Sequence, residues 1–148
     1  RGRGVWSQVC VGISSVLGAI FFREPNGALV FRQVKAARVR GLVISAWTLT
    51  EMASIGAIKE RTSAIDHATR RQALSTFHRF ASSNLILVEI EPADFRSAAV
   101  LIEKPGSLRA GDALHLALAK RLSADLATLD RRLAEAAPGC GVPLLPIG

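Results

Sequence analysis

Apolar and polar residues alternate in two different ways along this chain. Short, uniformly apolar runs are separated by longer segments in which apolar residues recur every three or four positions. The short runs predict strands that are buried on both faces, and the longer segments predict amphipathic helices. Strands are expected at residues 9–13, 42–46, 85–90 and 125–129, with an edge strand at 142–147 whose prolines limit its pairing. Helices are expected at residues 16–22, 28–40, 48–59, 63–82, 93–103, 109–122 and 133–137.

The order of these elements predicts the fold class. One or two helices follow each of the first four strands, which is the pattern of parallel strands joined by right-handed crossovers. We therefore expect an α/β fold, a three-layer α/β/α sandwich with a mostly parallel central sheet. The 148 residues are enough for one domain with a substantial core, with residues 1–8 as an irregular lead.

Three acidic residues fall where strands end or helices begin. Asp112 lies in the first turn of the predicted helix 109–122, and Asp130 follows the predicted strand 125–129. Glu51 lies near the start of the helix that follows the second strand. In a parallel sheet these positions share the carboxyl edge, where ligands bind. Carboxylates gathered there would form a hard, oxygen-rich site suited to Mg²⁺ or Mn²⁺.

Each acid also has a purely structural explanation. Thr48 and Glu51 have the spacing of a capping box, and Asp112 suits the positive end of a helix dipole. Asp130 could cap the helix that starts at Arg131. Taken singly, each residue is well explained in this way. Three carboxylates at one edge repel one another, however, and that cost makes sense when a cation sits among them.

Composition narrows the partners and the compartment. The 19 basic and 12 acidic residues give a net charge of +7, which favours nucleic acid over membrane, although a solvated basic surface is the other explanation. Cys10 and Cys140 lack metal-ligand spacing, so we expect free thiols, no zinc and a cytoplasmic location. The longest apolar run, residues 9–22, is too short for a membrane span and lacks a signal-peptide cleavage site before Arg23.

Residues 109–117 and 124–130 resemble the PIN-domain family, in particular the VapC-type toxin ribonucleases of bacterial toxin–antitoxin pairs. Residues 22–25 and 45–51 are similar to that family in order and spacing, so the resemblance extends over nearly the whole chain after Gly12. It implies a PIN-like fold and a metal-dependent endoribonuclease that cuts single-stranded RNA with Mg²⁺ or Mn²⁺. It also implies a cognate antitoxin and a homodimer.

The resemblance assigns roles to five residues. Glu51, Asp112 and Asp130 match the family's acidic positions, which are catalytic and bind the metal. Ser15 matches the hydroxyl residue after the first strand, and Thr128 matches the hydroxyl two positions before the last acid. These hydroxyls would orient water and phosphate. No protein nucleophile is needed. We expect His115, three residues after Asp112, to pack or hydrogen-bond on its helix.

The chain departs from the family at one position. Ile13 stands where the family has an aspartate, two residues before Ser15, and no acid occurs before Glu24. This leaves three alternatives: a catalytically impaired module that only binds RNA or antitoxin, an altered N-terminal sequence, or compensation by another acid. Glu24 is the nearest acid, but we expect it to lie past the end of the first helix.

Overall fold

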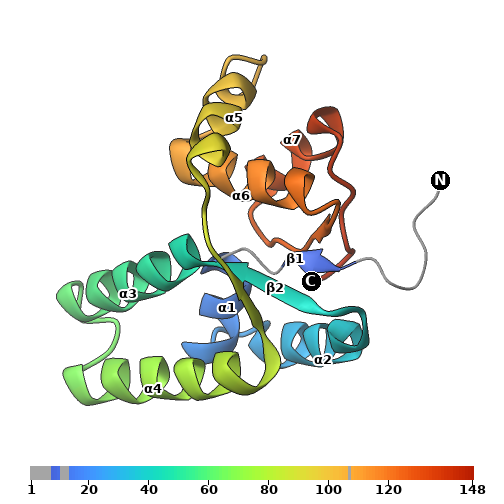
Figure 1. Ribbon diagram of the computed structural model, residues 1–148. Helices are drawn as coiled ribbons and strands as arrows, with labels where there is room; N and C mark the ends of the chain where they lie inside the picture. Colours follow the sequence, from blue (N-terminus) through green and yellow to red (C-terminus); the bar gives the residue numbers. More distant parts are fainter. Residues whose placement is uncertain (1–7, 11–13, 107) are drawn as a thin grey trace.

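The computed structural model describes residues 8–10, 14–106 and 108–148 (Figure 1). The elements run, in chain order, β1 (Val9–Cys10), α1 (Ser14–Phe21), α2 (Gly27–Ala37), the 3-10 helix η1 (Arg38–Arg40), β2 (Leu42–Ser45), α3 (Ala46–Arg61), α4 (His67–Asn84), β3 (Ile86–Val88), α5 (Pro92–Ile102), α6 (Ala110–Arg121), β4 (Asp125–Leu126), α7 (Arg131–Ala136) and the 3-10 helix η2 (Pro138–Cys140).

The four strands form one sheet in the order β3-β2-β1-β4, and every neighbouring pair is parallel. Val9 of β1 pairs with Leu42 of β2 on one side and with Asp125 of β4 on the other. The central position of β1 and β2 in the sheet explains the apolar residues 42–44 of β2; all four residues of this strand, Ser45 included, are buried. The prediction of a mostly parallel α/β sheet is confirmed.

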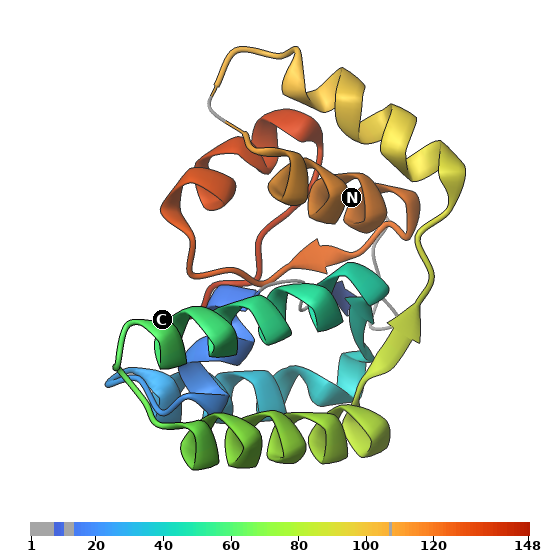
Figure 2. The same cartoon turned by 90° about the vertical axis from the view of Figure 1, so that its left-hand side faces the viewer.

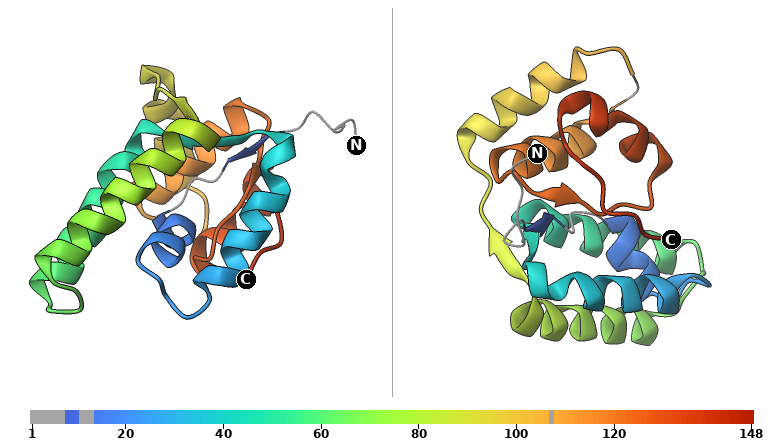
Figure 3. Two further views of the ribbon diagram at one scale, coloured as in Figure 1. Left: turned by 90° about the horizontal axis from the view of Figure 1, so that it is seen from below. Right: turned by 90° about the vertical axis from the view of Figure 1, so that its right-hand side faces the viewer.

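Helices cover both faces of the sheet (Figures 1 and 2). Helices α5, α6 and α7 lie on one side, and α1 to α4 lie on the other, so the predicted three-layer sandwich is confirmed. Each side has its own apolar core; Leu126 of β4 belongs to one core, and Ala127, the residue after β4, belongs to the other. Figure 3 shows α3 and α4 side by side as a long antiparallel pair.

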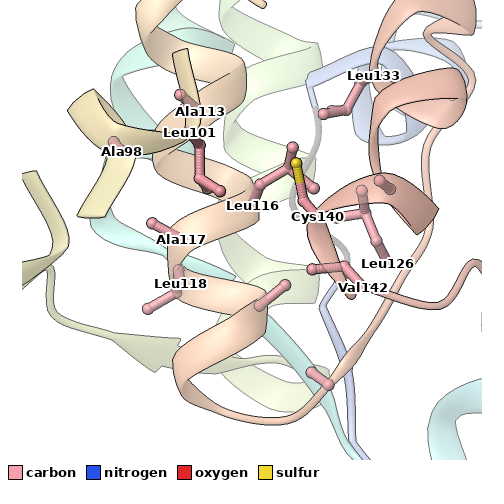
Figure 4. Packing of buried hydrophobic residues seen from close by; sticks show 13 residues of the cluster. Ala98, Leu101, Ala113, Leu116, Ala117, Leu118, Leu126, Leu133, Cys140 and Val142 are labelled. Atoms are coloured by element: carbon pink, nitrogen blue, oxygen red, sulfur yellow. The ribbon is translucent and has the colours of Figure 1, made fainter. Parts of the chain in front are cut away.

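Helix α6 runs through the middle of the first core (Figure 4). Its Leu116 points toward Leu126, Leu133 and Cys140, while Ala117 lies on the side of α5. Small alanine side chains allow α5 and α6 to pack closely. The first turn of α6 carries Asp112, and the helix is buried on two sides, so the position of this acid is fixed by the core.

The predicted capping box at Thr48 and Glu51 is wrong. Helix α3 begins at Ala46, directly after β2, and Ser45 occupies the extended cap position with φ −90° and ψ 161°. Thr48 therefore lies inside the first turn, where it is fully buried, and Glu51 falls in the second turn. Because the strand runs into the helix without a loop, the boundary lies three residues earlier than the motif indicated.

Other helix and strand boundaries also differ from the predicted ones, for reasons in the local structure. Helix α4 starts at His67 because Asp66 caps it, accepting a hydrogen bond of 2.7 Å from the Thr69 amide. The predicted helix 28–40 ends at residue 37 and continues as η1, which Gly41 terminates with φ 84°. The expected edge strand at 142–147 is a single bridge between Leu126 and Leu144, and its two prolines donate no backbone hydrogen bonds.

Two further points follow from the helices and the start of the chain. Of the first predicted strand, residues 9 and 10 form β1, and residues 11–13 lie outside the described residues. No helix in the described part of the chain combines the length and apolar character needed to cross a bilayer.

Candidate active site

Three separate elements bring the predicted acids to one edge of the sheet. Glu51 lies in the second turn of α3, and Asp112 lies in the first turn of α6. Asp130 is the N-cap residue of α7, four residues after the end of β4. The charges of Asp130 and Glu51 both act on the carboxyl of Asp112. The structure thus places Glu51 and Asp130 each within electrostatic reach of Asp112, although Glu51 and Asp130 are 79 positions apart in the sequence.

Asp112 is the acid most affected by this arrangement. Burial raises the pKa of its carboxyl, the negative charge of Asp130 raises it further, and Glu51 adds a smaller contribution in the same direction. A backbone hydrogen bond at Arg109 and the charge of His115 oppose these effects without cancelling them. The pKa of Asp112 therefore stays above its ordinary value, first because the carboxyl is buried and second because other carboxylates lie near it.

Asp130 has a structural role as well. Its Oδ1 accepts a hydrogen bond of 3.1 Å from the Leu133 amide and so caps α7. The capping explanation from the sequence is therefore correct for this residue, and the cap fixes the carboxylate at the edge of the sheet. The backbone amide of Asp130 donates to Thr128 Oγ1 at 3.0 Å, which holds the preceding turn.

The two predicted hydroxyl residues lie next to each other. Ser15 Oγ is 3.4 Å from Thr128 Oγ1, and it accepts a hydrogen bond of 3.1 Å from the Leu129 amide. Ser15 belongs to α1, so these bonds fasten the start of that helix to the segment that carries Asp130. The observed contacts support the chain around the acids, and any role in orienting water or phosphate stays a prediction.

Glu51 has a partner that the sequence did not indicate. His115 Nε2 lies 2.6 Å from Glu51 Oε1, and the histidine is only 1% exposed. His115 was expected to pack or hydrogen-bond on its own helix; it is packed in the interior there, but its hydrogen bond crosses to α3. The two residues are 64 positions apart, so no local pattern could have predicted the contact. The pairing also replaces the capping explanation of Glu51, which the start of α3 at Ala46 removed.

The missing family aspartate is not replaced by the nearest acid. Ile13 itself lies outside the described residues. Glu24 lies in the turn after α1 and forms an ion pair of 3.4 Å with Lys59 at the far end of α3. Lys59 is eight residues beyond Glu51, or about 12 Å along the helix. Glu24 therefore lies past the helix, as expected, and points away from the three acids.

A polar hollow of about 490 Å³ opens beside Asp112 and Asp130. It is lined by Arg109, Asp112, Asp130, Arg131, Arg132 and Glu135. Its three arginines are exposed, and none of them forms a side-chain ion pair with another described residue. Sequence reasoning assigned these arginines no role, although Arg131 and Arg132 are the two residues that follow Asp130. Cations that stay unpaired beside carboxylates can bind an anionic ligand.

The donor set suits Mg²⁺ or Mn²⁺ only with help from other ligands. Among residues 8–10, 14–106 and 108–148, no three histidine, cysteine or acidic side chains are grouped tightly enough to hold an ion alone. Mg²⁺ commonly binds through one or two carboxylates and keeps waters or substrate phosphates as its other ligands. Asp112 and Asp130, which line one hollow and interact electrostatically, fit that kind of site.

Comparison with known proteins agrees with this architecture. The PIN domain profile matches residues 14–138 of the chain. The structure of VapBC2 from Rickettsia felis, bound to a DNA fragment from its promoter, has a TM-score of 0.72 at 14% identity and covers 95% of this chain and 99% of that one. PAE2754 from Pyrobaculum aerophilum has a TM-score of 0.63 at 20% identity, covering 94% of this chain and 85% of that one.

FitAcB from Neisseria gonorrhoeae has a TM-score of 0.62 at 13% identity and covers 94% of this chain and 96% of that one. A search of the curated proteins gives no significant match. At these identities the solved structures establish a shared fold. The family profile covers most of the chain, including the segments that carry Glu51, Asp112 and Asp130. The chain therefore belongs to the PIN domain family.

Proposed function

We propose that this chain is the toxin of a type II toxin–antitoxin pair, a Mg²⁺- or Mn²⁺-dependent endoribonuclease that hydrolyses phosphodiester bonds in single-stranded RNA. The observation that carries the proposal is the approach of Glu51 and Asp130 to Asp112, beside a hollow that is also lined with exposed arginines. Membership of the PIN family and the likeness to the VapBC2 and FitAcB structures support it. The net charge of +7 suits a polyanionic substrate.

Each residue of the site has its own proposed role. Asp112 and Asp130 would hold the ion, and Glu51 would provide a third carboxylate. When bound, the ion lowers the pKa of a water molecule and neutralises charge that develops on the phosphate. Ser15 and Thr128 hold the segment that carries Asp130, so that the carboxylates keep their positions as the substrate binds.

The arginines of the hollow contribute on the substrate side. Arg109, Arg131 and Arg132 contact the phosphates that flank the cleaved bond, and their planar forks suit two oxygens of one phosphate. Such contacts carry no base information, so they explain affinity for RNA and leave the cleavage sequence to other parts of the surface.

The proposed partners follow from the same assignment. We expect a cognate antitoxin, whose own basic side chain would compete for the acidic site, and a homodimer of the toxin in the cytoplasm. Sedimentation of the purified chain tests the dimer. Co-purification with the product of any small gene found next to this one, followed by inhibition of RNA cleavage, tests the antitoxin.

The decisive experiment is cleavage of a labelled single-stranded RNA by the chain with Mn²⁺ and with EDTA. Asp112→Asn keeps the shape of the side chain and removes its charge, so we expect a loss of at least about 100-fold in rate. Glu103→Gln, an acid-to-amide change on the exposed end of α5, is the matched control and should cut normally. Equal activity of the chain and Asp112→Asn would contradict the proposal.

Because Ile13 stands where the family has an aspartate, the same cleavage assay should also be run on Ile13→Asp. If the chain binds RNA without cutting it, and Ile13→Asp restores Mn²⁺-dependent cleavage, then the chain is an impaired PIN module that only binds RNA or antitoxin. If neither form cuts RNA or binds Mn²⁺, the acids serve only the structure.

A further inference from the structure

His115 occupies an unusual position for a polar residue. It lies one turn after Asp112 on the buried face of α6, and its neighbours Leu116 and Ala119 belong to the apolar core. In the described part of the chain, its bond to Glu51 is the one side-chain hydrogen bond that connects α3 with α6. The position of Glu51 relative to Asp112 therefore depends on this contact.

The direction of the hydrogen bond follows from the chemistry of the two groups. A carboxylate offers only acceptors, so His115 Nε2 carries the hydrogen and donates it to Glu51 Oε1 at 2.6 Å. His115 Nδ1 is also buried and has no hydrogen-bond partner among the described residues. An apolar side chain would fill this part of the core without that cost, so packing alone does not explain a histidine here.

The second oxygen of Glu51 faces the start of α6. A Cβ atom built on Gly111 would lie 3.3 Å from Glu51 Oε2 and 3.0 Å from Trp47 Nε1. Gly111 directly precedes Asp112, so Oε2 lies beside the backbone that carries the next acid. Trp47, one turn before Glu51 in α3, packs against the same glycine and limits the movement of the carboxylate on that side.

We propose that His115 is a positioning residue: by binding Oε1, it holds Glu51 so that Oε2 is presented to a divalent cation shared with Asp112. The inference rests on the proposed function, because it gives Glu51 a metal to face. Outer hydrogen bonds of this kind orient carboxylate ligands, and their removal typically weakens metal binding by about 10–100-fold.

The test measures Mn²⁺ affinity by calorimetry on the whole chain without RNA. His115→Leu removes the donor and keeps an apolar side chain of similar size, and we expect it to weaken Mn²⁺ binding by about 10-fold or more. His115→Gln places an amide N–H at the reach of Nε2 and should restore most of the affinity. In a Glu51→Gln background, His115→Leu should cause no further loss, because the histidine acts through Glu51.

Two results would overturn the proposal. One is wild-type Mn²⁺ affinity in folded His115→Leu. The other is an equal loss with and without Glu51, which indicates a general structural effect. If His115→Leu does not fold, His115→Asn replaces it, because its shorter amide stays polar but does not reach Glu51.

A measurement without metal separates this inference from the proposed function. In the ¹⁵N spectrum of the imidazole, the metal-free chain should show the hydrogen of His115 on Nε2, and Glu51→Gln should change that signal. A hydrogen on Nδ1 with none on Nε2 would refute the positioning role, because Nε2 could then not donate to Glu51. If the spectrum agrees but the chain binds no Mn²⁺, the proposed metal-dependent function fails while the Glu51–His115 contact stands.

Discussion

Asp94 should contribute a large, pH-dependent share of the stability that holds α6 in place. Its carboxylate is 2% exposed and accepts hydrogen bonds from Arg121 Nε at 2.9 Å and Nη2 at 3.0 Å, which tie the start of α5 to the last turn of α6. The same carboxylate accepts a hydrogen bond of 2.8 Å from the Glu91 amide, completing a capping box.

The magnitude follows from the interactions that Asp94→Asn removes or weakens. The amide can still cap α5, so the helix-capping share of about 1 kcal/mol is largely kept. The charge-assisted pair with Arg121 is lost, and a hydrogen bond to a charged group contributes about 1.5–3 kcal/mol. The Arg121 side chain is 30% exposed, so solvent screening lowers that contribution, and we expect a net loss of about 1.5–2 kcal/mol at pH 7.

The pH dependence has a definite sign. Burial favours the neutral acid, but the hydrogen bonds from Arg121 and the Glu91 amide outweigh it and hold the pKa of Asp94 below its ordinary value of 3.8. A group whose pKa is lowered by folding stabilises the protein above the unfolded-state pKa, and this contribution is lost as the pH falls through the folded-state pKa. The stability difference between the chain and Asp94→Asn should therefore shrink as the pH falls below about 4.

Urea unfolding at pH 7, 5 and 3 measures this difference. The matched control is Asp66→Asn, because Asp66 is an exposed cap of α4 and asparagine caps helices equally well, so its stability should hardly change. A difference for Asp94→Asn below about 0.5 kcal/mol at pH 7, or one that stays constant down to pH 3, would refute the reasoning.

Two other substitutions test the surroundings of the acids. Gly111→Ala places a Cβ 3.0 Å from Trp47 Nε1 and 3.3 Å from Glu51 Oε2, so these side chains must shift, and we expect about 10-fold weaker Mn²⁺ binding by calorimetry. Gly139→Ala, with open space around it, is the control, and equal affinities would contradict the geometry. Arg131→Ala should weaken binding of single-stranded RNA in EDTA and lower the slope of log affinity against log salt by about 0.7. Arg71→Ala, on the exposed face of α4, is the control and should leave both unchanged. Identical slopes for the chain and Arg131→Ala would show that Arg131 does not contact the RNA.

The sequence by itself determined the layers of the fold and the edge at which the acids meet. Apolar runs such as residues 42–44 have only one stable location, between two layers of helices, because uniformly apolar strands must be covered on both faces. Once the strands are parallel, strand ends and helix starts lie at the same edge, whatever their separation in the chain. The proximity of Asp112 and Asp130 follows from that topology.

Local sequence was less reliable where two signals competed for one boundary. The Thr48–Glu51 spacing indicated a cap, but α3 starts at residue 46 because β2 leads straight into it. A capping box needs only four residues of suitable type, so it recurs by chance, while the actual start of a helix also depends on how the preceding strand is paired. The strand register, which involves β1 and β3, is a property of the whole sheet.

Only the tertiary structure decided which side chains face each other across elements. The contact between Glu51 and His115 spans 64 positions, and that between Asp94 and Arg121 spans 27. Such pairs depend on the distance and rotation of one packed helix relative to another, which the periodicity within each helix does not specify. A pattern along the chain tells which face of a helix is buried, but the partner of a polar group on that face is set by how the packed helices meet.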